Sequence, residues 1–462
     1  MVATSQPTAT AAGLRVLSRG GNAVDAAVAA AAALCVTEPM STGPGGDLFA
    51  LVFTDGRVEG LDAAGPAPRG ASPGQPAAQF GPRSITVPGA VAGWAALAER
   101  YGRLGLEACL EDAVELASGG FAVGSRCAAL WAAAAHVPDQ FQPVPRPGCR
   151  VALPDLARTL ADIACNGPVA FYQGRVGEAI CSASWLEEAD LTAFQPRWVT
   201  PLEVSYEGHT VLEMPPPAQG IAALEGLALL DRTERTLIDR ITCSRLALED
   251  ALREVRDGAD VGHLLDPANV DRRLADAPAR LTEPGGGTVY LCAVDADGMA
   301  VSLVQSLFEG FGSGVVAADT GVVLQNRGAC FSVNGSVEPG RRPYHTIIPG
   351  MISKDGCLLG PFGVMGGFVQ AQAHLQLVHG LLSDGLDPQA ALDRPRFRVE
   401  GDRLLLEKGL WAVAPALSVT GLRPVLEQDR THFGGGQAIM RTSSGTLIGG
   451  SDSRKDGCAV GW

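Results

Sequence analysis

The sequence lacks the features that would direct a chain to a membrane or through the secretory pathway. Its first residues, MVATSQPTATAAGL, have neither the basic segment nor the apolar run of a signal peptide. The longest apolar stretch, residues 23–36, is shorter than the roughly 20 residues that a membrane-spanning helix needs. We therefore expect a cytoplasmic protein with no membrane partner.

The sequence also has no excess of positive charge and no spacing of residues that is typical of metal ligands. There are 50 acidic and 36 basic residues, and the net charge of -14 argues against nucleic acid as a partner. The 11 cysteines include no CxxC pair, which suits scattered free thiols in a reducing compartment better than a disulfide framework. His374 and His379 lie on one expected helix at a poor spacing for two metal ligands. We expect no metal and no cofactor.

The chain does contain enough apolar sequence for a large folded core. Hydrophobic residues make up 46% of the 462 positions and charged residues 19%, which argues against a disordered protein. The first half is rich in helical patterns and the second half in strand patterns, but the first half also supplies strands. One layered α/β domain fits this distribution better than two independent domains.

The expected helices and strands follow from the spacing of apolar residues and from the turns between them. Helices are expected at residues 8–19, 23–36, most of 90–135, 154–165, 219–232, 244–256 and 369–382. Strands are expected at residues 48–53, 57–63, 289–294, 299–305, 347–352, 357–360, 403–407, 437–441 and 446–449. Residues 64–83 and 137–152, which are rich in proline or glycine, are expected to be loops.

Thr288 follows three glycines and begins one of the expected strands. A threonine hydroxyl is a weak nucleophile unless a base takes its proton, and an N-terminal threonine can use its own α-amine as that base. Such a threonine must be released by cleavage of the peptide bond before it, and Gly287 leaves that bond sterically open. The same residues also fit an ordinary strand start, which the local sequence alone favours.

A second glycine-rich segment, Gly363-Val-Met-Gly-Gly-Phe368, leads into the helix expected at residue 369. Backbone N–H groups at the start of a helix can stabilise an oxyanion. A plain strand-to-helix turn has the same pattern, so the segment indicates an oxyanion site only together with other features.

A third polar region contains several arginines between glycine-rich turns. It holds Arg327, Arg341, Arg342 and His345. An arginine can form two parallel hydrogen bonds with a carboxylate, so the region is a candidate anion-binding site. The alternative is a solvated basic loop.

Longer motifs, each rich in glycine, proline or small residues, follow one another along nearly the whole chain. They are Gly20-Gly-Asn-Ala-Val-Asp-Ala-Ala27, Glu38-Pro-Met-Ser-Thr-Gly-Pro-Gly-Gly46, Val87-Pro-Gly-Ala-Val-Ala-Gly93, Met214-Pro-Pro-Pro217, Phe311-Gly-Ser-Gly314, Arg342-Pro343, Met365-Gly-Gly367 and Ser451-Asp452. In this order they resemble the γ-glutamyltranspeptidase family of N-terminal-nucleophile (Ntn) hydrolases.

The resemblance implies a four-layer αββα sandwich, cleavage of the chain by itself, and no cofactor. Cleavage before Thr288 would give a large segment, 1–287, and a small segment, 288–462, of roughly 30 and 18 kDa, which together form one domain. Thr288 falls on the family's nucleophile, and Ser306 falls on the threonine that supports this nucleophile by a hydrogen bond. Gly366 and Gly367 fall on the glycines of the oxyanion hole.

The positions that read the substrate depart from those of γ-glutamyl enzymes. Ala64 or a neighbour stands where an arginine binds the α-carboxylate of glutamate, and Cys330 replaces the acidic residue that binds its α-amine. A positively charged Arg327, joined by His345, would repel an α-ammonium group and attract a carboxylate. The predicted substrate-binding residues are Arg327, Cys330, His345, Thr346, Phe308 and Arg342.

These departures resemble the family's γ-glutamyltranspeptidase-like branch, which includes oxamate amidohydrolase-like enzymes and C–C bond hydrolases of antibiotic pathways. We therefore expect a hydrolase of a small carboxylated substrate of the oxamate or oxalyl type, with C–N cleavage and C–C cleavage in secondary metabolism both left open. The expected partners are this substrate and, in a heterodimer, the two cleavage fragments, with further dimerisation also open. Two alternatives remain: a γ-glutamyltransferase or glutathione hydrolase, and an uncleaved binding protein, which Val289 in place of a second threonine would suit.

Overall fold

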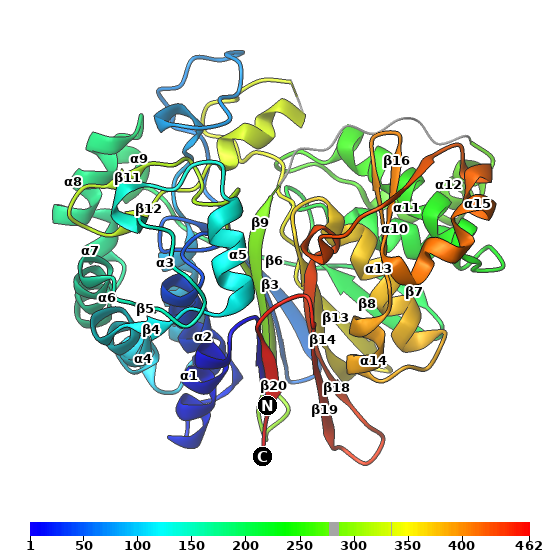
Figure 1. The fold of residues 1–462 in the computed structure, drawn as a ribbon, viewed down its shortest axis with the longest axis horizontal. Helices are drawn as coiled ribbons and strands as arrows, with labels where there is room; N and C mark the ends of the chain where they lie inside the picture. Colours follow the sequence, from blue (N-terminus) through cyan, green and yellow to red (C-terminus); the bar gives the residue numbers. More distant parts are fainter. Residues whose placement is uncertain (277–285, 334) are drawn as a thin grey trace.

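The computed structural model describes residues 1–276, 286–333 and 335–462, and two large β-sheets lie between two layers of helices (Figure 1). The first sheet has the order β20 (Cys458–Val460), β1 (Val2–Thr4), β9 (Gly287–Val294), β10 (Ala300–Phe308), β2 (Asp47–Thr54), β3 (Arg57–Ala63) and β6 (Arg197–Val199). The second has the order β19 (Leu447–Ser451), β18 (Gly435–Arg441), β14 (Cys357–Met365), β13 (Gly350–Lys354), β8 (His209–Glu213) and β7 (Leu202–Tyr206). This is the expected αββα sandwich.

Each helical layer covers the outer face of one sheet (Figure 1). Against the first sheet lie α1 (Pro7–Ser18), α2 (Ala23–Thr37), α3 (Ala90–Tyr101), α4 (Gly105–Gly119), α5 (Ser125–Ala133), α6 (Pro154–Asn166), α7 (Val169–Tyr172), α8 (Gly174–Ala183) and α9 (Glu188–Thr192). On the side of the second sheet lie α10 (Gly220–Leu230), α11 (Leu237–Glu254), α12 (Pro267–Arg273), α13 (Val369–Leu382), α14 (Pro388–Asp393) and α15 (Ala414–Leu417).

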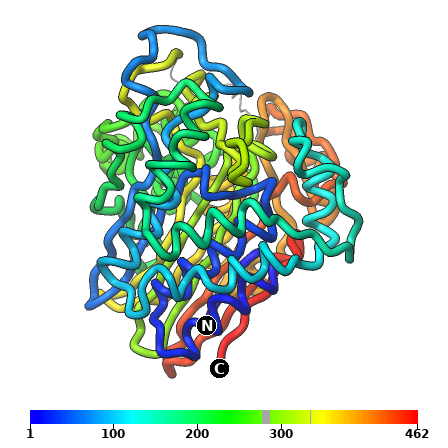
Figure 2. The backbone as a smooth tube through the Cα atoms, turned by 90° about the vertical axis from the view of Figure 1, so that its left-hand side faces the viewer, coloured from blue at the N-terminus to red at the C-terminus, as the bar shows by residue number. Residues whose placement is uncertain are grey.

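Shorter strands extend the two sides of the sandwich. They are β4 (Phe121–Ala122) with β5 (Arg150–Val151), β11 (Val316–Ala317) with β12 (Val322–Val323), and a small sheet of β15 (Phe397–Glu400), β16 (Arg403–Leu406) and β17 (Arg423–Leu426). Figure 2 views the molecule from the side of α1 and α2, and the two chain ends lie close together there, as expected from the pairing of β1 with β20. In the described ranges, no helix is both long enough and apolar enough to cross a membrane.

The alternation of side chains along the central strands produces the layers. In β9, Val289 and Leu291 face the helices around α2, whereas Tyr290 and Cys292 face the second sheet. Because successive side chains on a strand point to opposite faces, a strand that is apolar at every position needs a packed layer on both sides. All the side chains of β10 are buried, so it too is covered on both sides.

Helix α2 shows why the helical layer packs so closely on this sheet. Asn22 begins the helix with a capping box: its Oδ1 accepts the N–H groups of Val24 and Asp25 at 3.0 and 3.1 Å, and Asp25 accepts the Asn22 N–H at 3.0 Å. Every residue of the helix is buried, and most are alanine. Small side chains let the helix axis approach β9 and β10 closely, so the helix supports the strands that carry Thr288 and Ser306.

Most of the expected long elements are confirmed, with differences at their ends. The helix expected at 369–382 has these bounds, and the expected hairpin is β2 and β3. Helix α11 begins at Leu237 rather than at residue 244. The hydroxyl of Thr236 accepts the N–H group of Asp239 at 3.2 Å and so caps the helix there. The loop expected at 64–83 is not wholly on the surface, since Ala64 is buried.

Candidate active site

Thr288 is the second residue of β9, and it lies beside a β-bulge in β10. The pairing of the two strands runs as far as Gln305 opposite Val289 and resumes at Phe308 opposite Gly287. Ser306 and Leu307 therefore form the bulge, which changes the direction of one side chain. This geometry brings the Ser306 Oγ within 3.2 Å of the Thr288 Oγ1.

The contacts of Ser306 assign the direction of this hydrogen bond. Ser306 Oγ donates to the carbonyl oxygen of Gly287 at 2.8 Å and accepts the Phe308 N–H at 2.8 Å. A hydroxyl has one proton and two lone pairs, so its one proton is already used. The Thr288 hydroxyl must then donate to Ser306, which leaves the lone pairs of Thr288 available for attack. The same serine polarises the carbonyl group of the peptide bond before Thr288.

Gly366 and Gly367 connect β14 to α13 beside this nucleophile. Their φ angles of 135° and 72° lie in the region that side chains rarely adopt, so both positions favour glycine. Among the residues that the structure describes, no acceptor takes the N–H group of either glycine. Gly366 lines the same cleft as Thr288. Two uncommitted donors beside a nucleophile are the requirement of an oxyanion hole.

A cleft of about 450 Å³ opens at Thr288 and Gly366. Its walls come from α5, from the small sheet of β15 and β16, and from the segments around residues 430 and 455. Cationic side chains on these walls include Arg126, Arg398 and Lys455. A substrate that reaches Thr288 through this cleft therefore passes charged groups.

Gly286 and Gly287 also line the cleft, and Gly286 lies between two site residues. A Cβ added to Gly286 would stand 3.1 Å from the Cα of Gly367 and 3.4 Å from the ring of Phe308. The uncut chain thus occupies space next to the oxyanion glycines.

Arg327 forms the centre of a buried cluster behind Phe308. Its Nη1 donates to the Thr346 Oγ1 at 3.1 Å and lies 3.9 Å from the Cys330 Sγ. Its Nε lies 3.8 Å from an oxygen of Asp47, and its guanidinium carbon is 4.5 Å from the centre of the Phe308 ring. Among the described residues, Nη2 has no hydrogen-bond partner. A buried guanidinium with unused donors is suited to a carboxylate.

Phe308 reaches this position through an unusual backbone angle. Its φ is 77°, a conformation that costs a bulky residue about 1–3 kcal/mol. An asparagine would tolerate this region more readily than a phenylalanine does. The ring lies against Arg327 and fills space on the side of Gly286.

His345 belongs to the same cluster, and both of its ring nitrogens lie close to oxygen atoms. Burial, and then the charge of Arg327, lower the pKa of His345 below its ordinary value, and Asp47 offsets this only in part. Its Nδ1 donates to the carbonyl oxygen of Pro343 at 2.7 Å, and its Nε2 lies 3.3 Å from Asp47. Burial disfavours the imidazolium, whereas the oxygen atoms at both ring nitrogens favour it, so the expected cationic donor at His345 stays a prediction.

Cys330 and Arg342 are both buried, but only Cys330 lies close to Arg327. Burial raises the pKa of the Cys330 thiol to about 11, so it remains protonated, with Arg327 opposing the shift. Arg342 donates through Nε to the carbonyl oxygen of Ala64 at 2.6 Å and lies 3.5 Å from Asp62. Arg342 does not line the cleft at Thr288, and its contacts fix the chain at residues 62–64.

Two residues of the site were not expected from the sequence. Asp47 lies against both Arg327 and His345, and it also accepts the Gly65 N–H at 3.2 Å. Gln219 donates to the carbonyl oxygens of Thr346 at 2.7 Å and of Gly367 at 3.2 Å, so it joins the buried cluster to the oxyanion glycines. Each follows a quoted motif closely, which is the signal that could have found it.

His374 and His379, whose spacing is poor for two metal ligands, contact polar groups in the core. His374 Nδ1 lies 2.6 Å from Glu213, and its Nε2 accepts the Val364 N–H at 2.9 Å. His379 lies 3.0 Å from the hydroxyl of Tyr206. Over the ranges that the structure describes, no group of three or more His, Cys, Asp or Glu residues is placed to hold a metal.

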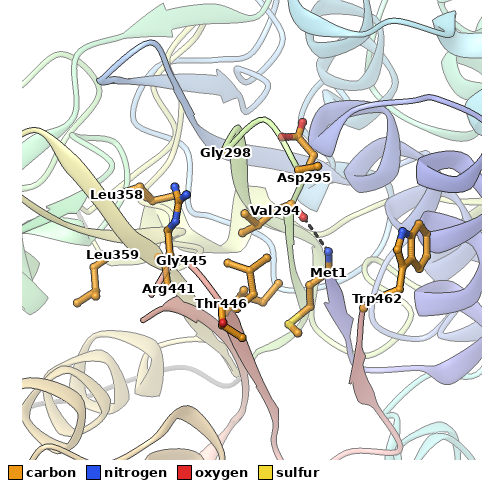
Figure 3. A pocket seen from close by; sticks show the side chains of 15 residues that line it. Met1, Val294, Asp295, Gly298, Leu358, Leu359, Arg441, Gly445, Thr446 and Trp462 are labelled. Carbon is orange, nitrogen blue, oxygen red and sulfur yellow. Dashed lines mark hydrogen bonds between the residues drawn. The ribbon is translucent and has the colours of Figure 1, made fainter. Parts of the chain in front are cut away.

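Another cavity, of about 380 Å³, lies at the opposite end of β9 from Thr288 (Figure 3). Met1, Asp295, Arg441 and Trp462 contribute to its lining, and the α-amine of Met1 donates to the carbonyl oxygen of Val294 at 2.7 Å. It contains none of the expected site residues.

Comparison with known proteins places this chain in a family. The model of the gamma-glutamyltranspeptidase family matches residues 9–462. The chain is 34% identical to the glutathione hydrolase-like YwrD proenzyme of Bacillus subtilis, over 100% of this chain and 98% of that protein. It is 32% identical to the oxamate amidohydrolase proenzyme of Klebsiella pneumoniae, over 97% of this chain and 96% of that protein. The crystal structure of a cephalosporin acylase from Bacillus halodurans superimposes with a TM-score of 0.93 at 38% identity, covering 100% of this chain and 95% of that one.

Proposed function

This chain belongs to the gamma-glutamyltranspeptidase family of hydrolases, and from that premise we propose that it cuts itself before Thr288 and then hydrolyses a small carboxylated substrate of the oxamate or oxalyl type. One observation carries the proposal. Ser306 Oγ contacts both the Thr288 hydroxyl, at 3.2 Å, and the carbonyl oxygen of the bond to be cut, at 2.8 Å.

In the first reaction, Thr288 Oγ1 attacks the carbonyl carbon of Gly287. The C–N bond breaks, an ester forms between Gly287 and the threonine oxygen, and the threonine nitrogen takes the hydroxyl proton. Water then hydrolyses the ester, which gives the carboxylate of Gly287 and a free α-amine on Thr288. The products are the segments 1–287 and 288–462.

In the second reaction, the new α-amine accepts the proton of the Thr288 hydroxyl during attack on the substrate carbonyl. The N–H groups of Gly366 and Gly367 stabilise the oxyanion, and the proton passes to the leaving group as the C–N bond breaks. Water releases the acyl group from Thr288. Cleavage of a C–C bond would use the same residues, provided that the leaving carbanion is stabilised by conjugation within the substrate.

The buried cluster around Arg327 supports the proposal that the acyl group of the substrate carries a carboxylate. Arg327 has an unused Nη2 donor, and a carboxylate placed against it would satisfy a buried charge. An α-ammonium group in the same place would meet the positive charge of Arg327 instead. A relative of similar length that is named an oxamate amidohydrolase favours the same substrate class.

The first experiment compares the purified wild type with Thr288→Ala by intact mass and denaturing gel. We expect two fragments from the wild type, with the smaller beginning at Thr288, and an intact chain from the variant. An intact wild type after long incubation would contradict the proposal and favour a binding protein. Thr288→Ser is the matched variant, since it keeps a hydroxyl nucleophile and should still cleave.

The second experiment offers the cleaved protein oxamate, an N-oxalyl amine and glutathione. We expect release of oxalate from the first two and little turnover of glutathione. Turnover of glutathione alone would instead support the γ-glutamyl alternative, for which the relative named glutathione hydrolase-like provides the specific reason.

A further inference from the structure

The turn that carries Gly366 and Gly367 is not fixed by its own side chains. Both residues have positive φ angles, 135° and 72°, and glycine adopts positive and negative φ about equally readily. A peptide unit between two such residues rotates at little cost, and a rotation would turn an N–H group away from its present direction. The position of the two oxyanion donors therefore depends on what holds the neighbouring carbonyl groups.

Two groups hold the carbonyl oxygen of Gly367. One is the N–H group of Gln370, which donates at 3.1 Å in the first turn of α13. The other is the side chain of Gln219, whose Nε2 donates at 3.2 Å. The first bond belongs to the regular start of a helix, whereas the second comes from the start of α10, far away in the chain. Gln219 thus joins the oxyanion turn to a separate element.

The side-chain amide of Gln219 has a single orientation. Its Nε2 also donates to the carbonyl oxygen of Thr346 at 2.7 Å, and its Oε1 accepts the hydroxyl of Tyr344 at 3.1 Å. Because carbonyl oxygens only accept hydrogen bonds, the atom that faces two of them must be the nitrogen. Both protons of the amide are used, and the side chain is fully buried.

The chain around Tyr344 gives Gln219 a firm support. The backbone N–H of Gln219 donates to the carbonyl oxygen of His345 at 2.9 Å, and the His345 N–H donates to that of Pro217 at 2.8 Å. The ring of Tyr344 is stacked on Phe368, with the centres 5.6 Å apart and the planes 15° from parallel. Since Phe368 directly follows the oxyanion turn, this support and the turn are packed against each other.

Thr346 connects the same support to the anion-binding cluster. Its hydroxyl accepts Nη1 of Arg327 at 3.1 Å, while its carbonyl oxygen accepts the amide of Gln219. One amide group therefore links the oxyanion turn to the segment that contacts the guanidinium. A short acyl group with a carboxylate must reach both places at once, so a small displacement of the turn would slow the reaction strongly.

We propose that Gln219 is a positioning residue for hydrolysis of the substrate. Its amide holds Gly367 in place relative to Thr346, and so keeps the N–H groups of Gly366 and Gly367 where the oxyanion forms. This inference rests on the proposed function, in which those N–H groups act on the substrate carbonyl. It adds a residue of the large segment to the oxyanion site of the small one.

The test compares Gln219→Met with Gln376→Met. Gln376 is a matched control, because its Nε2 also donates to two carbonyl oxygens, those of Gln372 and Phe397, each at 3.0 Å. Its Oε1 likewise accepts one hydrogen bond, from the Phe397 N–H at 3.1 Å. Each substitution removes two donated bonds and one accepted bond, but only Gln219 has a described bond to the oxyanion turn. A merely structural role predicts similar effects of the two substitutions.

We expect Gln219→Met to lower kcat by about 10- to 100-fold and to change KM by less than about twofold, because oxyanion donors act in the transition state. The substrate is whichever of oxamate, an N-oxalyl amine and glutathione the wild type turns over. Gln376→Met should keep the kcat of the wild type. Tyr344→Phe keeps the stacked ring and removes the hydroxyl that orients the amide, so it should lower kcat by about three- to tenfold.

A second measurement does not depend on the substrate class. The cleaved proteins are given 4-nitrophenyl acetate, and release of 4-nitrophenolate is followed, with Thr288→Ala as the blank. This ester has no carboxylate for Arg327, but its carbonyl oxygen needs the oxyanion donors. We expect release by Gln219→Met to be about tenfold slower or more, and release by Gln376→Met to equal that of the wild type.

Self-cleavage shows whether each variant folds. Gln219 has no described hydrogen bond to Thr288 or to Ser306, so Gln219→Met should cut itself at the rate of the wild type. If it does not fold, the decision passes to Tyr344→Phe, in which an unchanged kcat would overturn the inference.

The outcomes separate this inference from the proposed function. Equal loss of kcat in Gln219→Met and Gln376→Met, or unchanged release of 4-nitrophenolate in both, would overturn the positioning role and leave the proposed function intact. Slower release by Gln219→Met alone, without turnover of oxamate or an N-oxalyl amine by the wild type, would support the positioning role and contradict the proposed substrate class. A cleaved wild type that does not release 4-nitrophenolate above the blank would contradict both.

Discussion

At the residue scale, the hydroxyl of Ser306 has contacts that serve both proposed reactions. In the uncut chain it polarises the Gly287 carbonyl and accepts the Thr288 hydroxyl. The bulge in β10 sets the direction of this hydroxyl group, because in a regular strand the side chain of Ser306 would point in another direction. The role of Ser306 therefore depends on the register of β9 and β10 as well as on its own hydroxyl group.

Replacing Ser306 tests this role directly. We expect Ser306→Ala to slow self-cleavage by about 10- to 100-fold, since it removes a hydrogen bond to the carbonyl oxygen that becomes negative. Ser306→Thr keeps the hydroxyl and should restore most of the rate. The rate is followed as the appearance of the two fragments on a gel, and an unchanged rate in the alanine variant would remove Ser306 from the mechanism.

In the proposed function, Arg327 acts only in the second reaction. We expect Arg327→Gln to lower kcat/KM for oxamate by about 100-fold or more, because a charge-assisted contact to the carboxylate is lost. Self-cleavage should continue, since the guanidinium contacts neither Thr288 nor Ser306 among the described hydrogen bonds. Equal loss of both reactions would show instead that the substitution disturbs the fold.

At the element scale, α10 and α11 bury a carboxyl group that no catalytic step uses. Glu225 of α10 is fully buried, and among the described residues neither of its oxygens has a hydrogen-bond partner. Burial, and then the nearby charge of Asp250, raise the pKa of Glu225 to about 10. The native protein therefore holds a proton there that the unfolded chain loses above its ordinary pKa of 4.5.

This difference sets a pH dependence of stability. Because the native state binds the extra proton, the contribution of Glu225 to the free energy of unfolding falls as the pH rises from 4.5 to about 10. We expect Glu225→Gln to melt at the same temperature as the wild type near pH 4 and at a higher temperature at pH 8. The exposed Glu203→Gln serves as control. A melting difference that does not grow with pH would contradict the assignment.

The elements also show how far the sequence could predict the structure. Long apolar runs such as α2 and β10 were predictable, because their pattern allows only a buried helix or a strand covered on both faces. β7 and β8 were not expected, since short strands with mixed polar and apolar residues have no pattern of their own. The bonds of Asp47 to His345 and of Gln219 to Gly367 join residues far apart in the chain, so only tertiary packing creates them.

At the scale of the whole molecule, the proposed cleavage divides the sheets without dividing the core. Apart from Gly287, β9 belongs with β10 to the segment after the cut, but the two strands lie between β1 and β2 of the segment before it. In the second sheet the two segments meet at one place, where β8 of the first segment pairs with β13 of the second. Neither segment could keep its sheets intact alone.

We therefore expect the two fragments to behave as one protein after cleavage. They should elute together in gel filtration, remain together on dilution, and unfold in a single thermal transition. The uncut Thr288→Ala chain gives the reference elution volume. Separation of the fragments without denaturant would contradict this arrangement.

The position of Gly286 between Gly367 and Phe308 has a consequence for how activity begins. In the proposed reaction, the first molecule to occupy the reactive groups is the chain itself, and its bond is cut from within. Activation is then a first-order process, with a half-time that does not depend on how many other copies are present. A sample diluted a thousandfold would mature as quickly as a concentrated one, so each molecule sets its own delay between folding and its first turnover.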